Sequence, residues 1–479
     1  MKDKKPDLEP TILIIFGITG DLSKRKLLPA LYHLVKNDLL HEQTEILGIT
    51  RGNTSLDSLL ETIELCVMDV YGECDSAIVQ KLHSMLSLKS MDVTSPAAYD
   101  DLYVELNSIE DKHGVHMNRL YYLSIPPNVA QPIITFLGQH GLNASCQHGA
   151  ASTRLLVEKP FGYNLSSARE LIEETNKQFG EEQIFRIDHY LAKETVQNIL
   201  AFRFNNPIFG PTWNANHIAQ IEVIANEKLT IEGRSNFYEQ TGALRDLIQS
   251  HLLQVLALVT MERPKEMTSE AIHASKLHLL EHIDAIKPDR VLTQAIRGQY
   301  EGYKDEVGND RSHTETYAAI QLHIDNDRWK GVPMIVRTGK ALAEKTSRVR
   351  VVYKPTAQTP HHNILTFRLQ PNEGIELSLR VKTPGYETEI QPAEMDFSYR
   401  RSFEGQEQPD AYERVLVDAV RGDHTLFATN DEIVESWRIV QSVLDEWAKN
   451  DTGLISYAVG SSGPTEVDSL NASSSLSTE

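Results

Sequence analysis

"TILIIFGITGDLSKRKLLPALYHLVKN", residues 11–37, decides the class of fold. Six residues rich in Ile and Leu end at Gly17, and a short turn then leads into an amphipathic segment. A continuous apolar run bounded by glycine is typical of a parallel strand that is buried on both faces. The stretch therefore predicts a strand, a tight turn and a helix in direct succession.

The same alternation of strand and helix continues to about residue 185. Further apolar runs occupy 44–53, 119–128 and 153–162, with helical patterns between them. Strands that alternate with helices predict a doubly wound α/β sheet.

After Ile187 the pattern changes to neighbouring strands with few helices between them. The expected elements are a strand at 217–229, a long helix at 242–261, strands at 315–325, 332–339, 348–354, 364–371 and 374–382, and helices at 410–421 and 430–449. Such a series favours an antiparallel sheet. We therefore expect an α/β domain over 1–187, a larger β+α domain with a mostly antiparallel sheet over 188–458, and a tail over 459–479 that is disordered at its end.

Composition limits the function. The 479 residues include 47 Lys and Arg against 67 Asp and Glu, which gives a net charge of −20. Nucleic-acid binding is disfavoured because neutralising phosphates requires clustered cations. An anionic substrate would need a local basic pocket.

Three cysteines, Cys66, Cys74 and Cys146, form neither a disulfide framework nor a zinc motif. No apolar run approaches the roughly 18 residues of a membrane span, and no signal region follows the charged N-terminus. No metal and no membrane association are expected. The composition indicates a cytoplasmic enzyme.

The turn after the first strand contains Gly17 and Gly20. Glycines there allow a pyrophosphate to approach the backbone at a helix N-terminus. The spacing is not the full dinucleotide fingerprint, so an ordinary tight turn remains an alternative. Arg51 follows the second strand, where an NAD site usually has an acidic residue, and it would attract a 2′-phosphate. Together the two features favour NADP.

"RIDHYLAKETVQNIL", residues 186–200, places Asp188, His189, Tyr190 and Lys193 at the start of an apolar helix. His189 and Lys193 are four residues apart, so we expect them to share one helix face near its positive end. This arrangement suits a dianionic phosphate. A solvated helix start is the alternative.

In the expected long helix, Leu247, His251 and Val255 recur every four residues, so His251 lies in the apolar stripe. A buried imidazole needs a partner, and a carboxylate would make it a stronger base. Asp188 is one candidate, although the spacing does not show that the two meet. A core histidine without a catalytic role remains possible.

Three lysines are further candidates. The bond between Lys159 and Pro160 could be cis, which would fix the lysine in place. Lys340 and Lys345 follow a predicted strand, and their alternative is an exposed cationic loop.

Ten motifs in order carry a resemblance that covers nearly the whole chain. They are "GxxGDL" (17–22), "EKPFG" (158–162), "RIDHYLxKExVQN" (186–198), "FGPxWN" (209–214), "EGR" (232–234), "RDxxQxHLLQ" (245–254), "RTGKAL" (337–342), "QPNE" (370–373), "PDAYERVL" (409–416) and "GPTE" (463–466). Together they resemble the glucose-6-phosphate dehydrogenase family.

The resemblance implies a Rossmann-type NADP-binding domain and a β+α domain for substrate and dimerisation. It implies oxidation of glucose 6-phosphate at C1 to the 6-phospho-lactone, the first step of the oxidative pentose phosphate pathway. His251 would be the general base and Asp188 would orient it. The implied substrate-binding residues are Lys159, His189, Tyr190, Lys193, Glu227, Asp246, Lys340 and Lys345, and the implied coenzyme-binding residues are Gly17, Thr19, Gly20, Asp21, Leu22, Arg51 and Lys159.

The resemblance also implies a homodimer or homotetramer. Some eukaryotic relatives carry a second, structural NADP site, but positions expected to be basic or aromatic there read Thr346, Glu376 and Ser378. Use of NAD as well as NADP stays open. Two rival hypotheses are another Rossmann-fold sugar oxidoreductase, which would not need the phosphate-binding pair, and a non-catalytic NADP-binding protein, which would not need an acid–base pair.

Overall fold

The computed structural model describes residues 8–144, 151–404 and 408–471. The chain forms two compact units. Unit 1 comprises residues 1–162, 166–192 and 409–430, and unit 2 comprises 163–165, 193–408 and 431–479. The division differs from the sequence-based one in placing 409–430 with the first unit and the main crossover after Ala192. Each unit is described separately.

Unit 1 is built on sheet A, in which β1 (Thr11–Phe16) is fully buried at a central position. The strand order is β15-β6-β5-β4-β1-β2-β3. All neighbours are parallel except the short β15, which runs antiparallel to β6. The six parallel strands have the order of a doubly wound dinucleotide-binding fold. The remaining strands are β2 (Glu45–Thr50), β3 (Leu86–Ser90), β4 (Asn118–Leu123), β5 (Thr153–Val157), β6 (Ile184–Ile187) and β15 (Phe427–Ala428).

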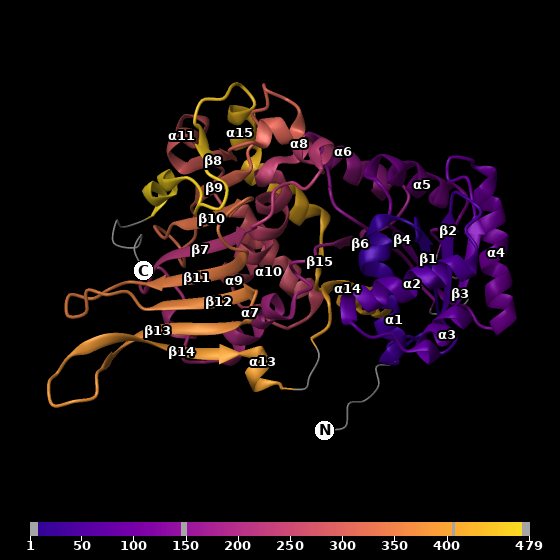
Figure 1. The fold of residues 1–479 in the computed structure, drawn as a ribbon, viewed down its shortest axis with the longest axis horizontal. Helices are drawn as coiled ribbons and strands as arrows, with labels where there is room; N and C mark the ends of the chain where they lie inside the picture. The colour runs from indigo at the N-terminus through magenta and orange to yellow at the C-terminus, as the bar shows by residue number, and fades with distance from the viewer. Residues whose placement is uncertain (1–7, 145–150, 405–407, 472–479) are drawn as a thin grey trace. The chain divides into compact units, whose positions relative to one another are not determined.

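Helices cover sheet A (Figure 1). They are α1 (Leu28–Lys36), α2 (Leu56–Tyr71), α3 (Ser76–Met85), α4 (Ala97–His113), α5 (Pro127–Gln139), α6 (Leu165–Asn176) and α14 (Ala411–Arg421). Alternate residues of β1, namely Ile12, Ile14 and Phe16, join one core cluster with Leu102 of α4 and Ile133 of α5. Burial on both faces explains the uninterrupted apolar pattern of this strand.

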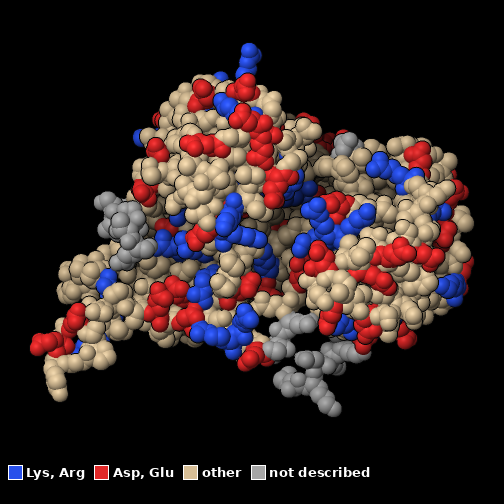
Figure 2. Space-filling view, viewed as in Figure 1, with Lys and Arg blue, Asp and Glu red and all other residues tan. Residues whose placement is uncertain are grey.

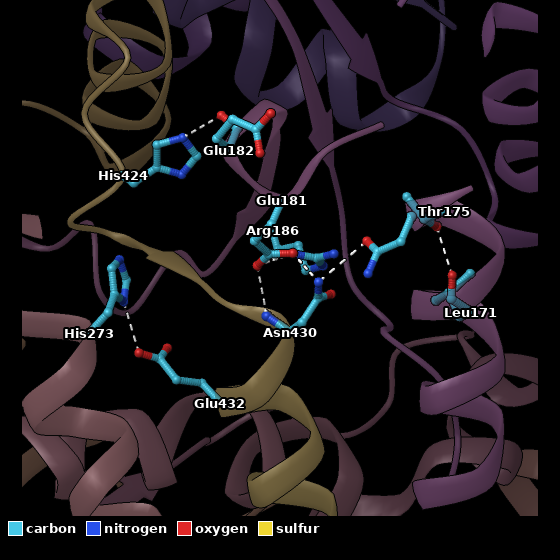
Figure 3. A network of polar contacts seen from close by, with 10 residues as sticks. Leu171, Thr175, Glu181, Glu182, Arg186, His273, His424, Asn430 and Glu432 are labelled. Atoms are coloured by element: carbon cyan, nitrogen blue, oxygen red, sulfur yellow. Dashed lines mark hydrogen bonds and ion pairs between the residues drawn. The ribbon is translucent and has the colours of Figure 1, made fainter. Parts of the chain in front are cut away.

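Residues 409–430 are tied into unit 1 by polar contacts, several of which Figure 3 shows. The backbone N–H of Asn430 donates to Oε1 of Glu181 (2.9 Å), and Nη1 of Arg186 donates to the same oxygen (3.1 Å). His424 donates to the carbonyl oxygen of Glu182 (2.9 Å). Local sequence patterns could not assign this segment because these partners lie about 250 residues earlier in the chain.

Unit 2 is built on the nine-stranded sheet B, ordered β14-β13-β12-β11-β7-β10-β9-β8-β16. The strands are β7 (Ile218–Asn226), β8 (Ala295–Tyr300), β9 (Tyr317–Leu322), β10 (Met334–Gly339), β11 (Thr346–Tyr353), β12 (Ile364–Gln370), β13 (Gly374–Lys382), β14 (Ile390–Ser398) and β16 (Leu454–Tyr457). Among the described strands of sheet B, only the pairs β7–β10 and β8–β16 are parallel, so the mostly antiparallel sheet is confirmed.

Figure 1 shows helices α7, α9 and α10 on one face of sheet B. The helices of unit 2 are α7 (Glu194–Asn205), α8 (Ser235–Ala243), α9 (Leu253–Thr260), α10 (Ser269–Glu281), α11 (Val291–Gln294), α12 (Tyr303–Val307), α13 (Tyr399–Ser402) and α15 (Asn430–Trp447), with a π-helix, η4 (Leu244–Leu252), between α8 and α9. The expected single helix at 242–261 is therefore divided. It begins with the last two residues of α8, where Gly242 forms a kink, and continues as η4 and α9.

A buried ion pair joins three of these helices. Nζ of Lys276 on α10 donates to Oε2 of Glu432 on α15 (2.9 Å) and to Oε1 of Gln254 on α9 (2.9 Å). The second carboxylate oxygen of Glu432 contacts Nδ1 of His273 (2.8 Å), a contact visible in Figure 3. These cations lower the pKa of Glu432 despite its burial. Full pairing is what allows charged side chains to be buried at this position.

The C-terminal segment up to residue 471 packs onto sheet B. Leu470 is fully buried, and its carbonyl oxygen accepts a hydrogen bond from Gln321 (2.8 Å). Residues 472–479, where terminal disorder was expected, lie outside the described residues, as does Cys146; Cys66 and Cys74 are free thiols. Among the described residues, no helix combines the length and apolar character that crossing a membrane requires.

Asp418 on α14 gives a prediction for the pH dependence of stability. Burial raises the pKa of this carboxyl to about 6, although Nε of Arg414 donates to it at 2.8 Å. In the unfolded chain the pKa is about 3.9, so the ionised form destabilises the folded state. This penalty is absent below about pH 4 and complete above about pH 6. Asp418→Asn should therefore raise the free energy of unfolding by on the order of 1–3 kcal/mol at pH 8.

Urea unfolding of both proteins at pH 4, 6 and 8 measures this difference. The gain should shrink as the pH falls and disappear near pH 4. A gain that is independent of pH would show that the carboxylate charge is not its cause.

Candidate active site

The glycine turn after β1 is shaped by close backbone contacts. Gly17 has φ +81°, and a Cβ atom there would lie 2.5 Å from the carbonyl oxygen of Ser124. A Cβ atom on Gly20 would lie 3.0 Å from the carbonyl oxygen of Gly17. Only glycine fits the first position, since it combines a left-handed backbone with no side-chain volume. This tightly packed turn, called the cradle below, lies at the end of a parallel strand, which is where dinucleotides bind.

The other candidate coenzyme residues surround this turn. Thr19 and Leu22 are partly buried, and Asp21 is exposed and paired with Arg25 (2.9 Å). Arg51 is exposed just beyond the end of β2. Its guanidinium is accessible to solvent, and its assignment to a 2′-phosphate stays a prediction.

Asp188 is buried and organises a turn after β6. Its Oδ1 accepts hydrogen bonds from the backbone N–H groups of Tyr190 (2.9 Å) and Leu191 (3.3 Å). Residues 189–192 therefore form a turn, and α7 begins only at Glu194, with Lys193 as its N-cap. The prediction that His189 and Lys193 share a helix face is wrong, because an aspartate that bonds the next backbone N–H groups favours a turn over a helix.

His189 is held by an acid and an aromatic ring. Its Nε2 lies 3.2 Å from Oε2 of Glu158, and its ring stacks on Tyr412 with centroids 4.1 Å apart. The phenol of Tyr122 donates to the other oxygen of Glu158 (2.6 Å). Burial raises the pKa of Glu158, but His189, Tyr122 and Lys159 together outweigh this effect and lower it. The carboxylate is therefore ionised near neutral pH and fixes the ring of His189.

The opposite ring nitrogen of His189, Nδ1, is buried and lacks a hydrogen-bond partner among the described residues. Lys193 lies at the N-terminus of α7, and its Nζ donates to Oε1 of Gln370 (2.5 Å). A helix N-terminus and a cationic side chain both favour an anion. The Lys159–Pro160 bond is cis, as the sequence suggested, and Tyr190 is partly buried in the turn.

His251 lies on the π-helix η4. Its side chain is buried, as are Leu247 and Val255, so the predicted apolar stripe is confirmed. Asp246 lies in the first turn of the same helix and is partly buried. π-helical turns are rare and occur often at functional sites. Helix η4 packs against β7, β9 and β10, so the sheet supports the segment that carries both residues.

Glu227 and Lys340 are brought together by the parallel strands β7 and β10. Nζ of buried Lys340 contacts Oε2 of Glu227 and lies 5.2 Å from the ring centre of Tyr238. The backbone N–H of Glu227 donates to the carbonyl oxygen of Gly339 (2.8 Å). Lys345, in contrast, is exposed just before β11. The alternative of an exposed cationic loop therefore holds for Lys345 but is wrong for Lys340, which is buried and paired.

Asp188 belongs to unit 1 and His251 to unit 2. Within its own unit, each is buried and held on a short, well-packed element. Their association therefore stays a prediction.

Comparison with known proteins supplies the family. Residues 14–198 match the family described as "Glucose-6-phosphate dehydrogenase, NAD binding domain", and residues 200–477 match "Glucose-6-phosphate dehydrogenase, C-terminal domain". The chain belongs to the glucose-6-phosphate dehydrogenase family.

Relatives of this family are similar over nearly their whole length. Glucose-6-phosphate 1-dehydrogenase of Chlamydia muridarum is 38% identical, covering 97% of this chain and 96% of the relative. That of Bacillus subtilis is 37% identical, covering 96% of each chain. A solved structure titled "Glucose-6-phosphate dehydrogenase in complex with its substrate glucose-6-phosphate" is 34% identical and matches with a TM-score of 0.90 over 97% of each chain. The enzyme from Mycobacterium avium is also 34% identical, with a TM-score of 0.84 over the same shares.

Figure 2 shows Lys and Arg side chains gathered over strands of sheet B on the face that it draws. Arg337 on β10 and Arg350 on β11 approach Glu222 on β7, at 3.9 Å and 3.0 Å. Glu376, one of the positions that the family resemblance led us to expect as basic or aromatic, accepts a hydrogen bond from Arg368 (2.9 Å). An acidic chain can thus still carry local basic regions.

Several residues that hold the candidate site were missed by sequence reasoning. Glu158, Gln370 and Tyr412 stand inside the quoted family motifs, but no role was assigned to them. Their place inside these motifs was the only feature of the sequence that could have indicated a role. Their roles follow only from contacts in the folded chain: Glu158 and Tyr412 contact His189, and Gln370 contacts Lys193. Gln370 and Tyr412 are far from these partners in the sequence.

Gly17→Ala should weaken binding of NADP by about tenfold or more, because the added Cβ forces the cradle away from Ser124. Fluorescence titration with NADPH measures the affinity. Gly52→Ala is the matched control, since a Cβ atom there meets nothing within 4 Å. Equal affinities in the two variants would contradict the assigned cradle.

Proposed function

We propose that the protein oxidises glucose 6-phosphate at C1 to 6-phospho-glucono-1,5-lactone and passes the hydride to NADP. The observation that carries the proposal is the full-length likeness to a structure titled as a complex with glucose 6-phosphate, combined with His251 buried on η4. NAD is a second candidate for the hydride acceptor, and the initial rates with each coenzyme described below test it. Free Cys66 and Cys74 fit the reducing cytoplasm, where we place the protein.

In this proposal His251 is the general base. A sugar hydroxyl is a weak acid, so its proton must leave as the hydride departs. An imidazole titrates near neutral pH and can take that proton at one ring nitrogen. Asp188 is assigned as the carboxylate that orients the imidazole. This assignment is supported by the fixed position of the Asp188 carboxylate, because the N–H groups of Tyr190 and Leu191 hold Oδ1 in place.

His189, Tyr190 and Lys193 are assigned to the phosphate of the substrate. Support comes from the buried, unpartnered Nδ1 of His189 and from the position of Lys193 at a helix N-terminus. Lys159, Glu227, Asp246 and Lys340 are assigned to sugar hydroxyls or to the coenzyme side of the site. The contact between Glu227 and Lys340 holds both groups in fixed positions, and Lys345 is assigned to substrate binding as a residue near the substrate.

Gly17, Thr19, Gly20, Asp21 and Leu22 are assigned to the coenzyme pyrophosphate, and Arg51 to its 2′-phosphate. When bound, the nicotinamide accepts the hydride, while the protein supplies position and electrostatics. The cradle at Gly17 fits such a group because Gly17 and Gly20 carry no side chain that would keep a pyrophosphate away from the backbone.

We further propose that the protein is a homodimer or homotetramer. Exposed apolar side chains on the outer strands β13 and β14, among them Val381, Ile390 and Met395, support association through sheet B.

His251→Asn should lower kcat by about 10²–10⁴-fold because it removes the base and leaves the binding groups in place. NADPH formation with saturating glucose 6-phosphate measures kcat, and calorimetry measures substrate binding, which should persist. Unphosphorylated glucose is the control substrate and should be much poorer. Wild-type turnover in the variant would remove His251 from its role, and equal use of both sugars would favour the rival sugar oxidoreductase.

Arg51→Ala should raise KM for NADP by about tenfold or more, since a charge-assisted bond to the 2′-phosphate is lost. The KM for NAD should stay unchanged because NAD lacks this phosphate. Initial rates with each coenzyme at fixed glucose 6-phosphate provide both values. An equal effect on both coenzymes would show that Arg51 has only a structural role.

A further inference from the structure

Helices α8 and η4 meet at a backbone kink that has a particular neighbour. Gly242 has φ +65° and ψ 174°, a conformation that residues with a side chain rarely adopt. A Cβ atom there would lie 2.4 Å from Oε1 and 2.7 Å from Oε2 of Glu315. The carboxyl group of Glu315 therefore occupies the space that a side chain at position 242 would need.

Glu315 binds the first two backbone N–H groups after the kink. Its Oε1 accepts from the N–H of Leu244 (3.0 Å), and its carbonyl oxygen accepts from the N–H of Ala243 (2.9 Å). The first N–H groups of a helix have no partner within the helix, and a carboxyl group is favourable there. Glu315 thus serves as a cap supplied from more than 70 residues further along the chain.

The cap stands on a rigid support. Glu315 is buried and lies two residues before β9, which pairs with both β8 and β10 in sheet B. The backbone N–H of Thr316 donates to the carbonyl oxygen of Gly298 (2.8 Å), and that of Lys340 donates to the carbonyl oxygen of Thr316 (2.9 Å). A shift of Glu315 would therefore require movement of the sheet.

Helix η4 begins at Leu244 and carries Asp246 in its first turn and His251 near its end. We propose that Glu315 is a positioning residue for the oxidation: its carboxyl group fixes the start of η4 and thereby the positions of Asp246 and His251. This role rests on the proposed function of His251 as the base. A misplacement of about 1 Å in a reacting group can cost roughly 100-fold in rate, so the anchor matters for turnover.

The positioning role of Glu315 does not depend on its protonation state. Burial raises the pKa of Glu315, and the N–H of Leu244 and the guanidinium groups of Arg245 and Arg297 oppose this rise. Oε1 can accept from Leu244 in either protonation state. A glutamine at this position keeps an acceptor oxygen, whereas an alanine does not.

The chain provides a matched control, Glu239 on α8. Its carboxylate accepts hydrogen bonds from Tyr303 (2.7 Å), Ser312 (2.6 Å) and Asn309 (3.0 Å). It therefore ties α8 to the segment that leads to Glu315, but these bonds involve no N–H group of η4. Removing it should weaken the same region without releasing the start of the helix.

Four variants test the proposal: Glu315→Ala, Glu315→Gln, Gly242→Ala and Glu239→Ala. Glu315→Ala and Gly242→Ala should lower kcat with glucose 6-phosphate and NADP by about tenfold to 100-fold, because the base is misplaced. Glu315→Gln should restore kcat to within about threefold of wild type, as should Glu239→Ala. The acidic limb of the pH profile of kcat, which reports the base in the complex, should move in Glu315→Ala and not in Glu239→Ala.

Hydrogen exchange of residues 243–252 is measured on the same proteins. Exchange there should be faster in Glu315→Ala and unchanged in Glu315→Gln. The proposal is overturned if Glu315→Ala keeps wild-type kcat, if Glu239→Ala loses as much kcat, or if exchange is equal in all variants. If the wild-type chain does not oxidise glucose 6-phosphate, the proposed function fails separately, and the exchange data still decide whether Glu315 anchors the helix. Should Glu315→Ala not fold, Gly242→Ala supplies the same comparison.

Discussion

The carboxyl group of Glu315 fills the space beside Gly242 and holds the backbone of Leu244, and this contact determines where η4 begins. Sheet B fixes Glu315, and η4 in turn carries His251 and Asp246. The position of an imidazole is thus set by a hydrogen bond seven residues away, at the start of its helix. A π-helix without its own side-chain cap depends on such an external partner.

Unit 1 uses the same physical device. Asp188 binds the backbone N–H groups of Tyr190 and Leu191, and Glu158 binds His189 and Tyr122. In each case a buried carboxylate is satisfied by donors and fixes a polar residue that the proposed chemistry needs. Buried carboxylates are costly unless they are fully paired, so each one restricts its surroundings to few arrangements. Fixed geometry at the site follows from that restriction.

The net charge of −20 is a property of the whole chain and does not give the local charge around the candidate site. Lys340 and Lys276 are buried beside Glu227 and Glu432, and Arg337 and Arg350 approach Glu222. These cations are thus paired with carboxylates of the same chain. Phosphate recognition in such a protein depends on which polar atoms keep hydrogen-bonding capacity, as Nδ1 of His189 does; it donates to a phosphate when the ring is protonated.

The sequence by itself determined the two sheets and most of their strands, because apolar runs and alternation report burial on one face or two. It missed β14, whose Pro392 is tolerated only at the edge that this strand occupies, and it also missed β3, β6, β8, β15 and β16. It also determined the glycine turn, the family motifs and the burial of His251. Only the tertiary structure decided that residues 188–192 form a turn, that 409–430 belong to unit 1, and that Glu315 caps η4. The physical reason is that a hydrogen bond between residues 70 or more positions apart leaves no period in the sequence, whereas burial of a whole strand or helix does.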